Sequence, residues 1–242
     1  MSIGDAEIKT QERVIRFFKD PEILGYQYIG NLSDYQNKNI KEDRLRQYLR
    51  LKGYADKLID AAVMQLQQEA GNLSRGVYDA NKTVYSRLKY GIPVSESPEK
   101  PPVTVELIDE TNPLNNDFAI AEEVTVVEQQ EKRPDLVIYL NGIAVAVIEL
   151  KRSSISVSEG IRQNLTNQKD SFIRGFFTTM QFCMAGNESE GLRYGTLLTG
   201  EKFYMEWKDD GFKEHEEERD PVDVRISKTC EGIDNKLLKQ IY

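Results

Sequence analysis

Residues 133–151 read RPDLVIYLNGIAVAVIELK, and this stretch decides how the chain folds. Two apolar runs flank the dipeptide Asn141-Gly142, which is the strongest short-range signal for a β-hairpin. An acid, Asp135, opens the first run, and Glu149 and Lys151 close the second. Charged groups are costly to bury without partners or a task, so their place at the ends of a buried hairpin points to chemistry.

The register of this hairpin determines whether the three charged side chains meet. Residues two apart in a strand share a face, so Glu149 and Lys151 point the same way. With a two-residue loop, Asp135 falls one position out of register with Glu149. With a three-residue loop that includes Ile143, Asp135 lies directly opposite Glu149, and Gly142 suits the left-handed position of such a loop. We therefore expect a three-residue loop that gathers all three groups on one face.

Two carboxylates on neighbouring strands make an oxygen-rich site for Mg²⁺, which completes its shell with water and a substrate phosphate. A nearby ammonium can hold the attacking water or stabilise charge that develops on the phosphoryl group. This arrangement resembles the Asp…Glu-x-Lys signature of the PD-(D/E)xK nucleases. A Glu-x-Lys triplet alone is more simply an exposed ion pair at a strand end, because short motifs are often fortuitous. The preceding Pro-Asp and the hairpin favour the nuclease.

Motifs on both sides of the hairpin make the resemblance more specific. They are Thr10-Gln11-Glu12, Gly25-Tyr26, Tyr90-Gly91-Ile92, Leu107-Ile108-Asp109, Asn112-Pro113, Asn115-Asn116-Asp117-Phe118, Ile161-Arg162-Gln163-Asn164, Asn167-Gln168-Lys169, Phe176-Phe177-Thr178-Thr179-Met180-Gln181 and Arg193-Tyr194-Gly195-Thr196. In this order they resemble the N-terminal region of the R subunit (HsdR) of type I restriction enzymes. The resemblance implies an α/β (α+β) fold, with a restriction-endonuclease-like mixed central sheet flanked by helices and a helical N-terminal part.

The same resemblance implies roles for five residues. Asp135 and Glu149 would bind the metal, and Lys151 would be the catalytic lysine. Glu12 matches a position at which this nuclease class often adds a helical carboxylate, although an acid early in a helix is also expected from the helix dipole. Gln163 fits the first position of a Gln-x-x-x-Tyr pattern that follows the core in many R subunits. An asparagine replaces the tyrosine, so the glutamine alone remains as an accessory candidate.

As a member of that family, the chain would be a type I site-specific deoxyribonuclease domain that uses Mg²⁺ to hydrolyse double-stranded DNA. Its partners would be the methyltransferase and specificity subunits of a restriction complex. The sequence contains no Gly-x-x-x-x-Gly-Lys-Ser/Thr phosphate loop, so ATP would be used only by motor domains of a longer subunit. Two alternatives stay open: a non-catalytic docking scaffold between the motor and the methyltransferase and specificity subunits, and a stand-alone nuclease or DNA-repair enzyme.

Composition excludes several other classes of protein. The 242 residues are 39% hydrophobic and 30% charged, which is typical of a soluble globular protein. No apolar run is long enough for a membrane span or a signal peptide. Cys183 and Cys230 are expected to be reduced, which fits a cytoplasmic location. With His215 as the single histidine, a Cys/His zinc site or a His-activated nucleophile is excluded, so carboxylates and lysines must supply any chemistry.

The net charge of −8 is unusual for a DNA-binding protein. Residues 206–220 hold eight acids and three bases, which leaves −3 for the remainder. Basic residues gather between Lys41 and Lys52 and again at Arg152, Arg162, Lys169 and Arg174. We expect the first cluster to be a solvated helix face rather than a phosphate-binding surface. Intrinsic affinity for DNA should therefore be weak.

Changes in hydrophobic period divide the chain into three parts. Residues 1–92 are expected to be helical and to pack on the core, with apolar residues at helical spacing. Residues 93–207 should form the nuclease core, beginning with a proline-rich loop. Its expected elements are strands at 103–109, 119–128, 134–140 and 144–151, a helix at 159–174, and strands at 181–185, 193–199 and 203–207. Residues 208–242 should form an acidic loop and a connection, with a helix near 234–241, to motor domains of a longer protein.

Overall fold

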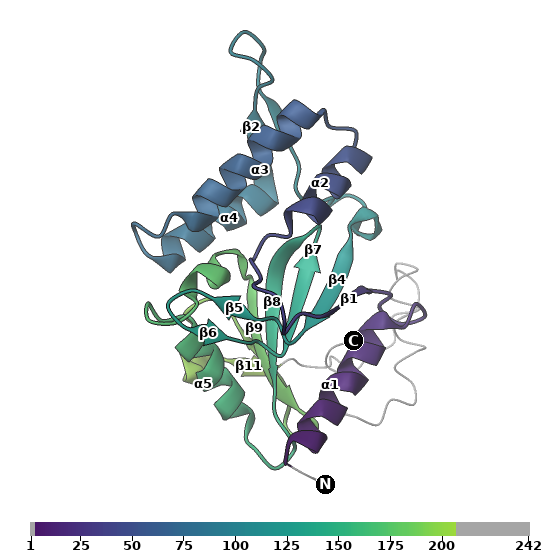
Figure 1. The fold of residues 1–242 in the computed structure, drawn as a ribbon, viewed down its shortest axis with the longest axis vertical. Helices are drawn as coiled ribbons and strands as arrows, with labels where there is room; N and C mark the ends of the chain where they lie inside the picture. The colour runs from purple at the N-terminus through teal and green to yellow at the C-terminus, as the bar shows by residue number, and fades with distance from the viewer. Residues whose placement is uncertain (1–2, 207–242) are drawn as a thin grey trace, which may run out of the picture.

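The computed structural model describes residues 3–206, so the segment 208–242 and its expected helix lie outside the described residues (Figure 1). At its centre is a seven-stranded sheet in the order β1-β4-β7-β8-β9-β10-β11. The β1–β4 and β8–β9 pairs are parallel and the other pairs are antiparallel. The expected mixed sheet with flanking helices and an N-terminal helical part is therefore confirmed.

The strands of this sheet are β1 (Gln27–Asn31), β4 (Phe118–Glu122), β7 (Leu136–Leu140), β8 (Ile143–Leu150), β9 (Phe182–Asn187), β10 (Gly191–Gly195) and β11 (Met205–Glu206). Two ribbons pair β2 (Ile92–Val94) with β3 (Val103–Val105) and β5 (Val126–Val127) with β6 (Glu131–Lys132). The helices are α1 (Ile3–Lys19), α2 (Glu42–Leu51), α3 (Asp56–Gly71), α4 (Val77–Tyr90) and α5 (Val157–Asn167). Short 3₁₀ turns are η1 (Pro113–Asn115), η2 (Arg174–Thr179) and η3 (Glu201–Phe203).

Helices α2, α3 and α4 form the helical part, which lies at one end of the sheet in Figure 1. Gly53 and Gly91 follow α2 and α4 with φ of 86° and 72°, a left-handed backbone that stops a helix at low cost in glycine. Leu45, Ile59 and Val84 are fully buried between the helices. No helix within residues 3–206 has the length and apolar character needed to cross a bilayer.

Several elements differ from the sequence prediction, including the strands expected over 103–109 and 193–199, which end at Val105 and Gly195. Residues 27–31, inside the segment expected to be helical, form edge strand β1, because pairing with the distant β4 outweighs local preference. The strand expected over 119–128 breaks at Glu123, whose φ is 50°. The helix expected over 159–174 ends at Asn167, and Phe176 and Phe177 in the following 3₁₀ turn are buried against the sheet.

The two faces of the sheet are covered by different elements. On one face, Val14 and Phe18 of α1 pack against Ile120 and Ile148. On the other face, the buried side chains of Phe176 and Phe177 in η2 pack against the sheet. The sheet is therefore sandwiched, and strands β7 and β8 at its centre are nearly inaccessible to solvent. This burial accounts for the continuous apolar runs in the sequence of the hairpin.

The turn of the β7–β8 hairpin has two residues, so the expectation of a three-residue loop is wrong. Leu140 pairs with Ile143, and Asn141 and Gly142 have φ of 52° and 82°, as in a type I′ turn. Gly142 is packed beneath α2, and its carbonyl accepts a hydrogen bond from the N–H of Lys41 at 2.7 Å. The tip is therefore closely packed against the start of α2.

A β-bulge restores the register that the site requires. Tyr139 pairs with Ala144, but Ile138 pairs with Ala146, so Val145 is an extra residue in β8. Continuing the shifted ladder places Asp135 opposite Glu149. The expected juxtaposition therefore arises from a tight turn plus a bulge.

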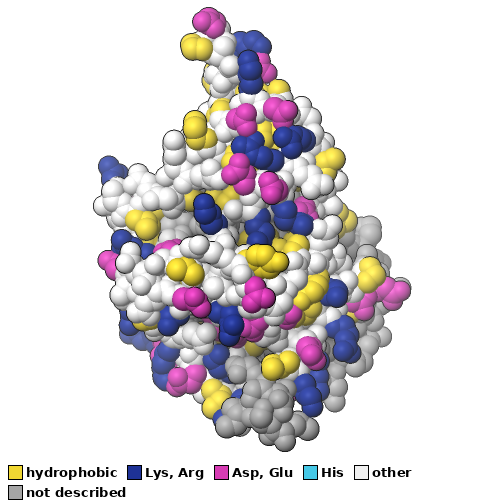
Figure 2. All heavy atoms as spheres, in the orientation of Figure 1, with side chains coloured by type: hydrophobic (Ala, Val, Ile, Leu, Met, Phe, Trp, Pro, Cys, Tyr) yellow, Lys and Arg dark blue, Asp and Glu magenta, His cyan; other side chains and the backbone are white. Residues whose placement is uncertain are grey.

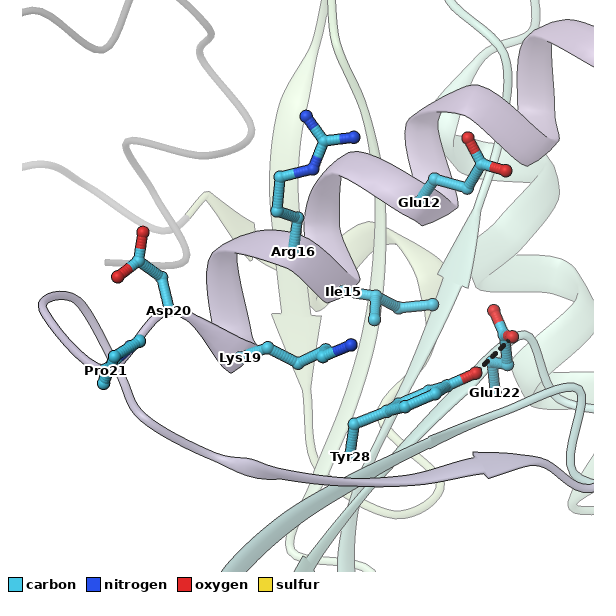
Figure 3. Close-up of a pocket in the computed structure, with 8 residues that line it drawn as sticks. All are labelled: Glu12, Ile15, Arg16, Lys19, Asp20, Pro21, Tyr28 and Glu122. Atoms are coloured by element: carbon cyan, nitrogen blue, oxygen red, sulfur yellow. Dashed lines mark hydrogen bonds between the residues drawn. The ribbon is translucent and has the colours of Figure 1, made fainter.

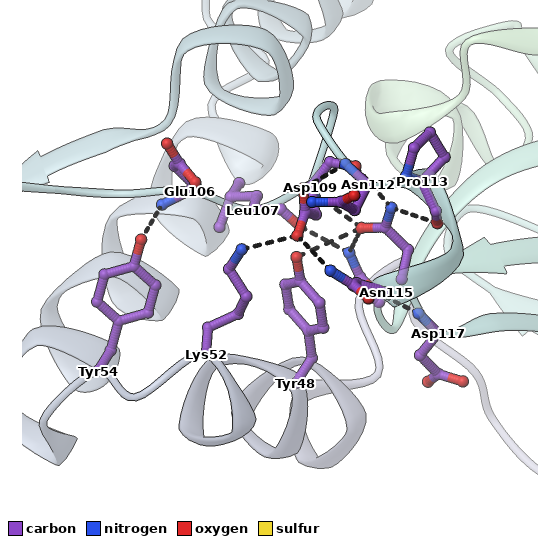
Figure 4. Close-up of polar contacts among 12 residues, drawn as sticks. Tyr48, Lys52, Tyr54, Glu106, Leu107, Asp109, Asn112, Pro113, Asn115 and Asp117 are labelled. Carbon is purple, nitrogen blue, oxygen red and sulfur yellow. Dashed lines mark hydrogen bonds and ion pairs between the residues drawn. The ribbon is translucent and has the colours of Figure 1, made fainter.

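A buried polar network joins the hairpin tip to the helical part (Figure 4). Asn141 donates to the side chain of Asn116 at 2.8 Å, and Asn116 also accepts from the N–H of Asp109. The carboxylate of Asp109 accepts from Lys52 of the helical part at 3.0 Å, and Tyr48 also donates to Asn116. Hydrogen bonds, first from the Asn115 side chain, hold the pKa of Asp109 well below its usual range. The Asp and Asn residues of this segment are thus structural.

Candidate active site

Asp135 lies immediately before β7, at the end of the hairpin away from the turn. Its carbonyl accepts the N–H of Glu123 at 2.8 Å, which extends the β4–β7 pairing by one residue. Its carboxylate Oδ2 accepts the N–H of Leu150 at 2.7 Å. This bond directs the carboxyl group toward the end of β8, where Glu149 and Lys151 lie.

Glu149 forms the floor of the site. The side chain is fully buried, and its Oε2 accepts a hydrogen bond of 2.6 Å from Nε2 of Gln163. Its other oxygen, Oε1, accepts no hydrogen bond from any donor within residues 3–206. A buried carboxylate oxygen without a donor is costly in an isolated protein. Such an oxygen is suited to a cation.

The pKa of Glu149 is raised well above its usual range. Burial is the largest cause, followed by the negative charge of Asp135, while the ammonium of Lys151 acts in the opposite direction. Two adjacent carboxylates resist double ionisation, because each disfavours the charged form of the other. A divalent cation between them would remove that repulsion and replace the proton.

Lys151 completes the group just beyond β8. Its Nζ donates to the carbonyl of Leu150 at 2.9 Å and lies 3.9 Å from Oδ2 of Asp135. The side chains of Lys151 and Asp135 are 15% and 18% exposed, whereas Glu149 is fully buried. The site is therefore reached from solvent past Asp135 and Lys151. The structure brings all three expected residues together.

Helix α5 supplies Gln163, the accessory residue expected from the resemblance. Ser156 caps the helix by accepting the N–H of Ser158. Gly160, one turn before Gln163, faces β8 and β9, and a Cβ there would lie 3.0 Å from that of Ala185 and 3.4 Å from that of Glu149. The missing side chain lets α5 approach closely enough for Gln163 to reach the carboxylate. The match to the Gln-x-x-x-Tyr pattern was the signal for Gln163, whereas nothing in the sequence indicated the part played by Gly160.

Replacing Gln163 with Leu is expected to weaken binding of Mn²⁺ to the chain by about tenfold to a hundredfold, the usual effect of losing a group that orients a metal ligand. The carboxylate of Glu149 would lose this donor, and its pKa would rise further. Calorimetric titration of the wild-type and Gln163→Leu chains measures the change. Gln65→Leu, a substitution in α3 that removes a hydrogen bond to Glu69 instead, serves as the control. Equal affinities in the three chains would show that Gln163 has no part in the site.

Glu12 lies outside this group of contacts. It is exposed on α1 and lines a hollow of about 500 Å³ together with Tyr28 and Glu122 (Figure 3). The hydroxyl of Tyr28 donates to Glu122, while Lys19 lies over the ring of Tyr28. Within residues 3–206, no hydrogen bond or ion pair joins Glu12 to Asp135 or Glu149. Its role as an accessory carboxylate remains a prediction.

The neighbouring Gln11 makes the contact between α1 and the edge of the site. Its Nε2 donates to Glu122 at 3.1 Å and to Glu123 at 3.2 Å. Glu123 also forms an ion pair with Arg133, whose Nε lies 2.9 Å from Oε2, and it contributes to the raised pKa of Glu149. Gln11 and Arg133 occur in sequence motifs that indicated no such contact, and no sequence pattern pointed to Glu123. A glutamate with left-handed φ carries no sequence signal, because only glycine and, less often, asparagine or aspartate prefer that conformation.

The donor set fits a hard divalent cation. Within residues 3–206, no group of three or more His, Cys, Asp and Glu side chains could enclose a metal ion. Asp135 and Glu149 supply two carboxylates on one face, and Mg²⁺ usually takes one or two from a protein and the rest from water and phosphate. A structural zinc site would need four ligands of another kind.

Comparison with known proteins gives the family. The model of the type I restriction enzyme R protein N terminus matches residues 7–203, which include every residue of the candidate site. The chain belongs to this family. Among its relatives, the type I restriction enzyme MjaIXP endonuclease subunit of Methanocaldococcus jannaschii is 33% identical over 97 residues, or 37% of this chain. The SsaAORF53P endonuclease subunit of Staphylococcus saprophyticus is 29% identical over 112 residues, or 44% of this chain.

These relatives are much longer than the region they share with this R-subunit N terminus. The matched stretches make up 9% and 12% of their own lengths. The similarity therefore concerns one region of a large subunit.

Proposed function

We propose that this R-subunit N terminus is a Mg²⁺-dependent endonuclease domain that hydrolyses phosphodiester bonds of double-stranded DNA. The observation that supports this most strongly is Glu149. It is fully buried, has one carboxylate oxygen without a donor from residues 3–206, and lies beside Asp135 and Lys151. A scaffold has no need of a buried, partly unsatisfied acid at a strand end, and retaining one lowers stability.

Each of the three residues has a distinct chemical task in this proposal. Asp135 and Glu149 would hold Mg²⁺, which supplies positive charge next to the phosphate oxygens. The ammonium of Lys151 would hold the attacking water and stabilise negative charge on the phosphoryl group. The water oxygen forms a bond to phosphorus and releases a proton, while the bond from phosphorus to the leaving oxygen breaks and that oxygen takes up a proton. Gln163 would keep the carboxylate of Glu149 oriented.

The proposed partners follow from the family. The DNA would be delivered by methyltransferase and specificity subunits, and ATP would be consumed by motor domains elsewhere in the complete R subunit. The isolated domain would then need little DNA affinity of its own. A net charge of −8 is consistent with this arrangement.

A metal titration of the 242-residue chain tests the proposal directly. We expect Mn²⁺ and Mg²⁺ to bind at millimolar concentrations or below, and Asp135→Asn to abolish this binding, because one of the two ligands loses its charge. Asp170→Asn, at an exposed position on an ion pair with Arg174, is the matched control and should bind as wild type does. Calorimetry gives both affinities. No binding by the wild-type chain would favour the docking scaffold instead.

A further inference from the structure

Charges of both signs are mixed over the face that Figure 2 shows. Most arginine side chains on helix α2 and near helix α5 form ion pairs with acids. The ion pairs are Arg44–Asp117, Arg46–Glu42, Arg46–Asp60, Arg50–Asp56, Lys52–Asp109, Arg162–Glu201 and Arg174–Asp170. A phosphate would have to compete with these carboxylates. The paired residues of the two basic clusters are therefore poorly suited to bind DNA.

Helix α4 presents a different kind of surface. Tyr78, Lys82, Tyr85 and Lys89 follow one another at spacings of four, three and four residues, which places them along one face, and Arg75 lies just before the helix begins. All five side chains are exposed, the two tyrosines by 58% and 48%. Within the described part of the chain, none of the three cations takes part in an ion pair with an acid. We call these five residues the α4 face.

The acids near the α4 face do not neutralise it. Glu69 on the adjacent α3 is engaged by Arg87, with two hydrogen bonds of 2.8 Å. Asp79 is the single acid of α4, and its carbonyl, not its carboxylate, accepts the hydroxyl of Thr83. Three cations thus face one acid along this side of the helix.

A solvated surface helix would explain the lysines of the α4 face but not its tyrosines. The buried side of α4 consists of Val77, Ala80, Val84 and Leu88, so the core does not use the aromatic rings. Arginine, lysine and tyrosine are all common donors to phosphate oxygens in protein–DNA interfaces. Exposed cations next to exposed tyrosines are better suited to binding a polyanion than to contact with solvent alone.

The α4 face also lies within reach of the candidate active site along one duplex. Asn81 of α4 donates to the carbonyl of Met180 at 2.8 Å, and the next residue, Gln181, donates to the carbonyl of Val145 in β8 at 2.7 Å. Four residues of strand separate Val145 from Glu149, or about 13 Å. The two hydrogen bonds and the peptide link between Met180 and Gln181 add about 8 Å. With a helix diameter of about 10 Å, the path is roughly 31 Å long. About nine base pairs span that distance at roughly 3.4 Å each.

We propose that the α4 face binds the phosphate backbone of duplex DNA that flanks the cleavage position. The proposal rests on the proposed function, which supplies DNA as the substrate. The chain as a whole repels DNA through its net charge of −8, so a local group of unpaired cations is needed to hold the duplex. Binding at this face is independent of sequence, because phosphate contacts position a protein without reading bases.

The test measures fluorescence anisotropy of a labelled duplex with the 242-residue chain in EDTA, over a range of salt concentrations. The Lys82→Gln/Lys89→Gln variant should bind more weakly at low salt, and the slope of log K against log salt should fall in magnitude by about 1.8, or 0.9 per lost phosphate contact. Lys38→Gln/Lys202→Gln makes the same change of net charge at exposed positions elsewhere and should retain the wild-type slope. Tyr78→Ser/Tyr85→Ser should weaken binding without changing the slope.

Equal slopes in the two lysine variants would overturn the proposal, as would the absence of duplex binding by the wild-type chain at the lowest salt. Poly-glutamate that bound as tightly as the duplex and lost affinity equally in Lys82→Gln/Lys89→Gln would identify an acidic protein partner. That result would also overturn the proposal. Asp135→Asn separates this proposal from the proposed function. If that variant still cleaves DNA in the assembled complex while the α4 variants lose binding, the active site is misplaced but the α4 face stands.

Discussion

Glu149→Gln is expected to abolish DNA cleavage by the complete restriction complex while its DNA-stimulated ATPase activity stays near the wild-type level. Loss of one preorganised charged group typically slows a reaction by about a hundredfold to a thousandfold, and loss of the metal should cost more. Asp135→Ala and Lys151→Ala should have the same effect on cleavage. Glu159→Gln, at an exposed position on α5, is the matched control. Plasmid cleavage and phosphate release, measured on the same preparations, separate chemistry from translocation.

The stability of the Glu149→Gln chain distinguishes a site residue from a structural one. The pKa of Glu149 is raised in the folded state, so its ionisation favours unfolding, and stability falls as pH rises from the usual glutamate range through the raised pKa. Without metal, the wild-type chain should therefore lose more stability than Glu149→Gln over that interval. The variant should be at least as stable at neutral pH. Urea unfolding in EDTA measures both trends, and a strongly destabilised variant would indicate that Glu149 is a structural acid.

Gly142→Ala is expected to destabilise the fold by about 2–5 kcal/mol, combining the cost of left-handed backbone with that of overpacking. A Cβ at this position would lie 2.6 Å from the carbonyl oxygen of Lys41 and 2.8 Å from the nitrogen of Leu45. The hairpin tip and α2 would have to separate. Because this contact also anchors the hairpin that carries Asp135 and Glu149, urea unfolding should show a large loss of stability.

Gly53→Ala is the matched control for this effect. Gly53 has a similar φ of 86°, but no heavy atom lies within 4 Å of a Cβ built there. The Gly53→Ala substitution should lower the free energy of unfolding only through backbone strain, by about 1–2 kcal/mol. If the two alanine variants unfolded at the same urea concentration, the close packing of the hairpin tip beneath α2 would not contribute to stability.

Local sequence features predicted the elements that are specified locally. Glycines such as Gly53 and Gly91 mark where α2 and α4 end, and Asn141-Gly142 marks the hairpin. The association of Asp135, Glu149 and Lys151 was also predicted, since alternation along a strand fixes which side chains share a face. These features depend on neighbours a few residues apart.

Features that depend on distant contacts were missed. Strand β1 exists because residues 27–31 pair with β4, more than eighty residues away in the chain. The two-residue turn is the one that Asn-Gly favours locally, and the expectation of a longer loop was wrong because it did not include the bulge at Val145. Glu123 was missed because its conformation and its bonds to Gln11 and Arg133 are imposed by three separate segments. Tertiary context decided the structure of residues 27–31 and of Glu123.

The bulge at Val145 allows the hairpin to lose one residue during evolution without separating the two acids. Deleting Val145 would leave Leu140 paired with Ile143 and would still bring Asp135 opposite Glu149, because the bulge accommodates one surplus residue. The turn and the carboxylate pair are thus set by separate parts of the hairpin, and the number of residues between the two acids is free to change by one. Relatives whose acids are one residue closer in sequence should build the same pair on a regular ladder. A search pattern with a fixed spacing would overlook them.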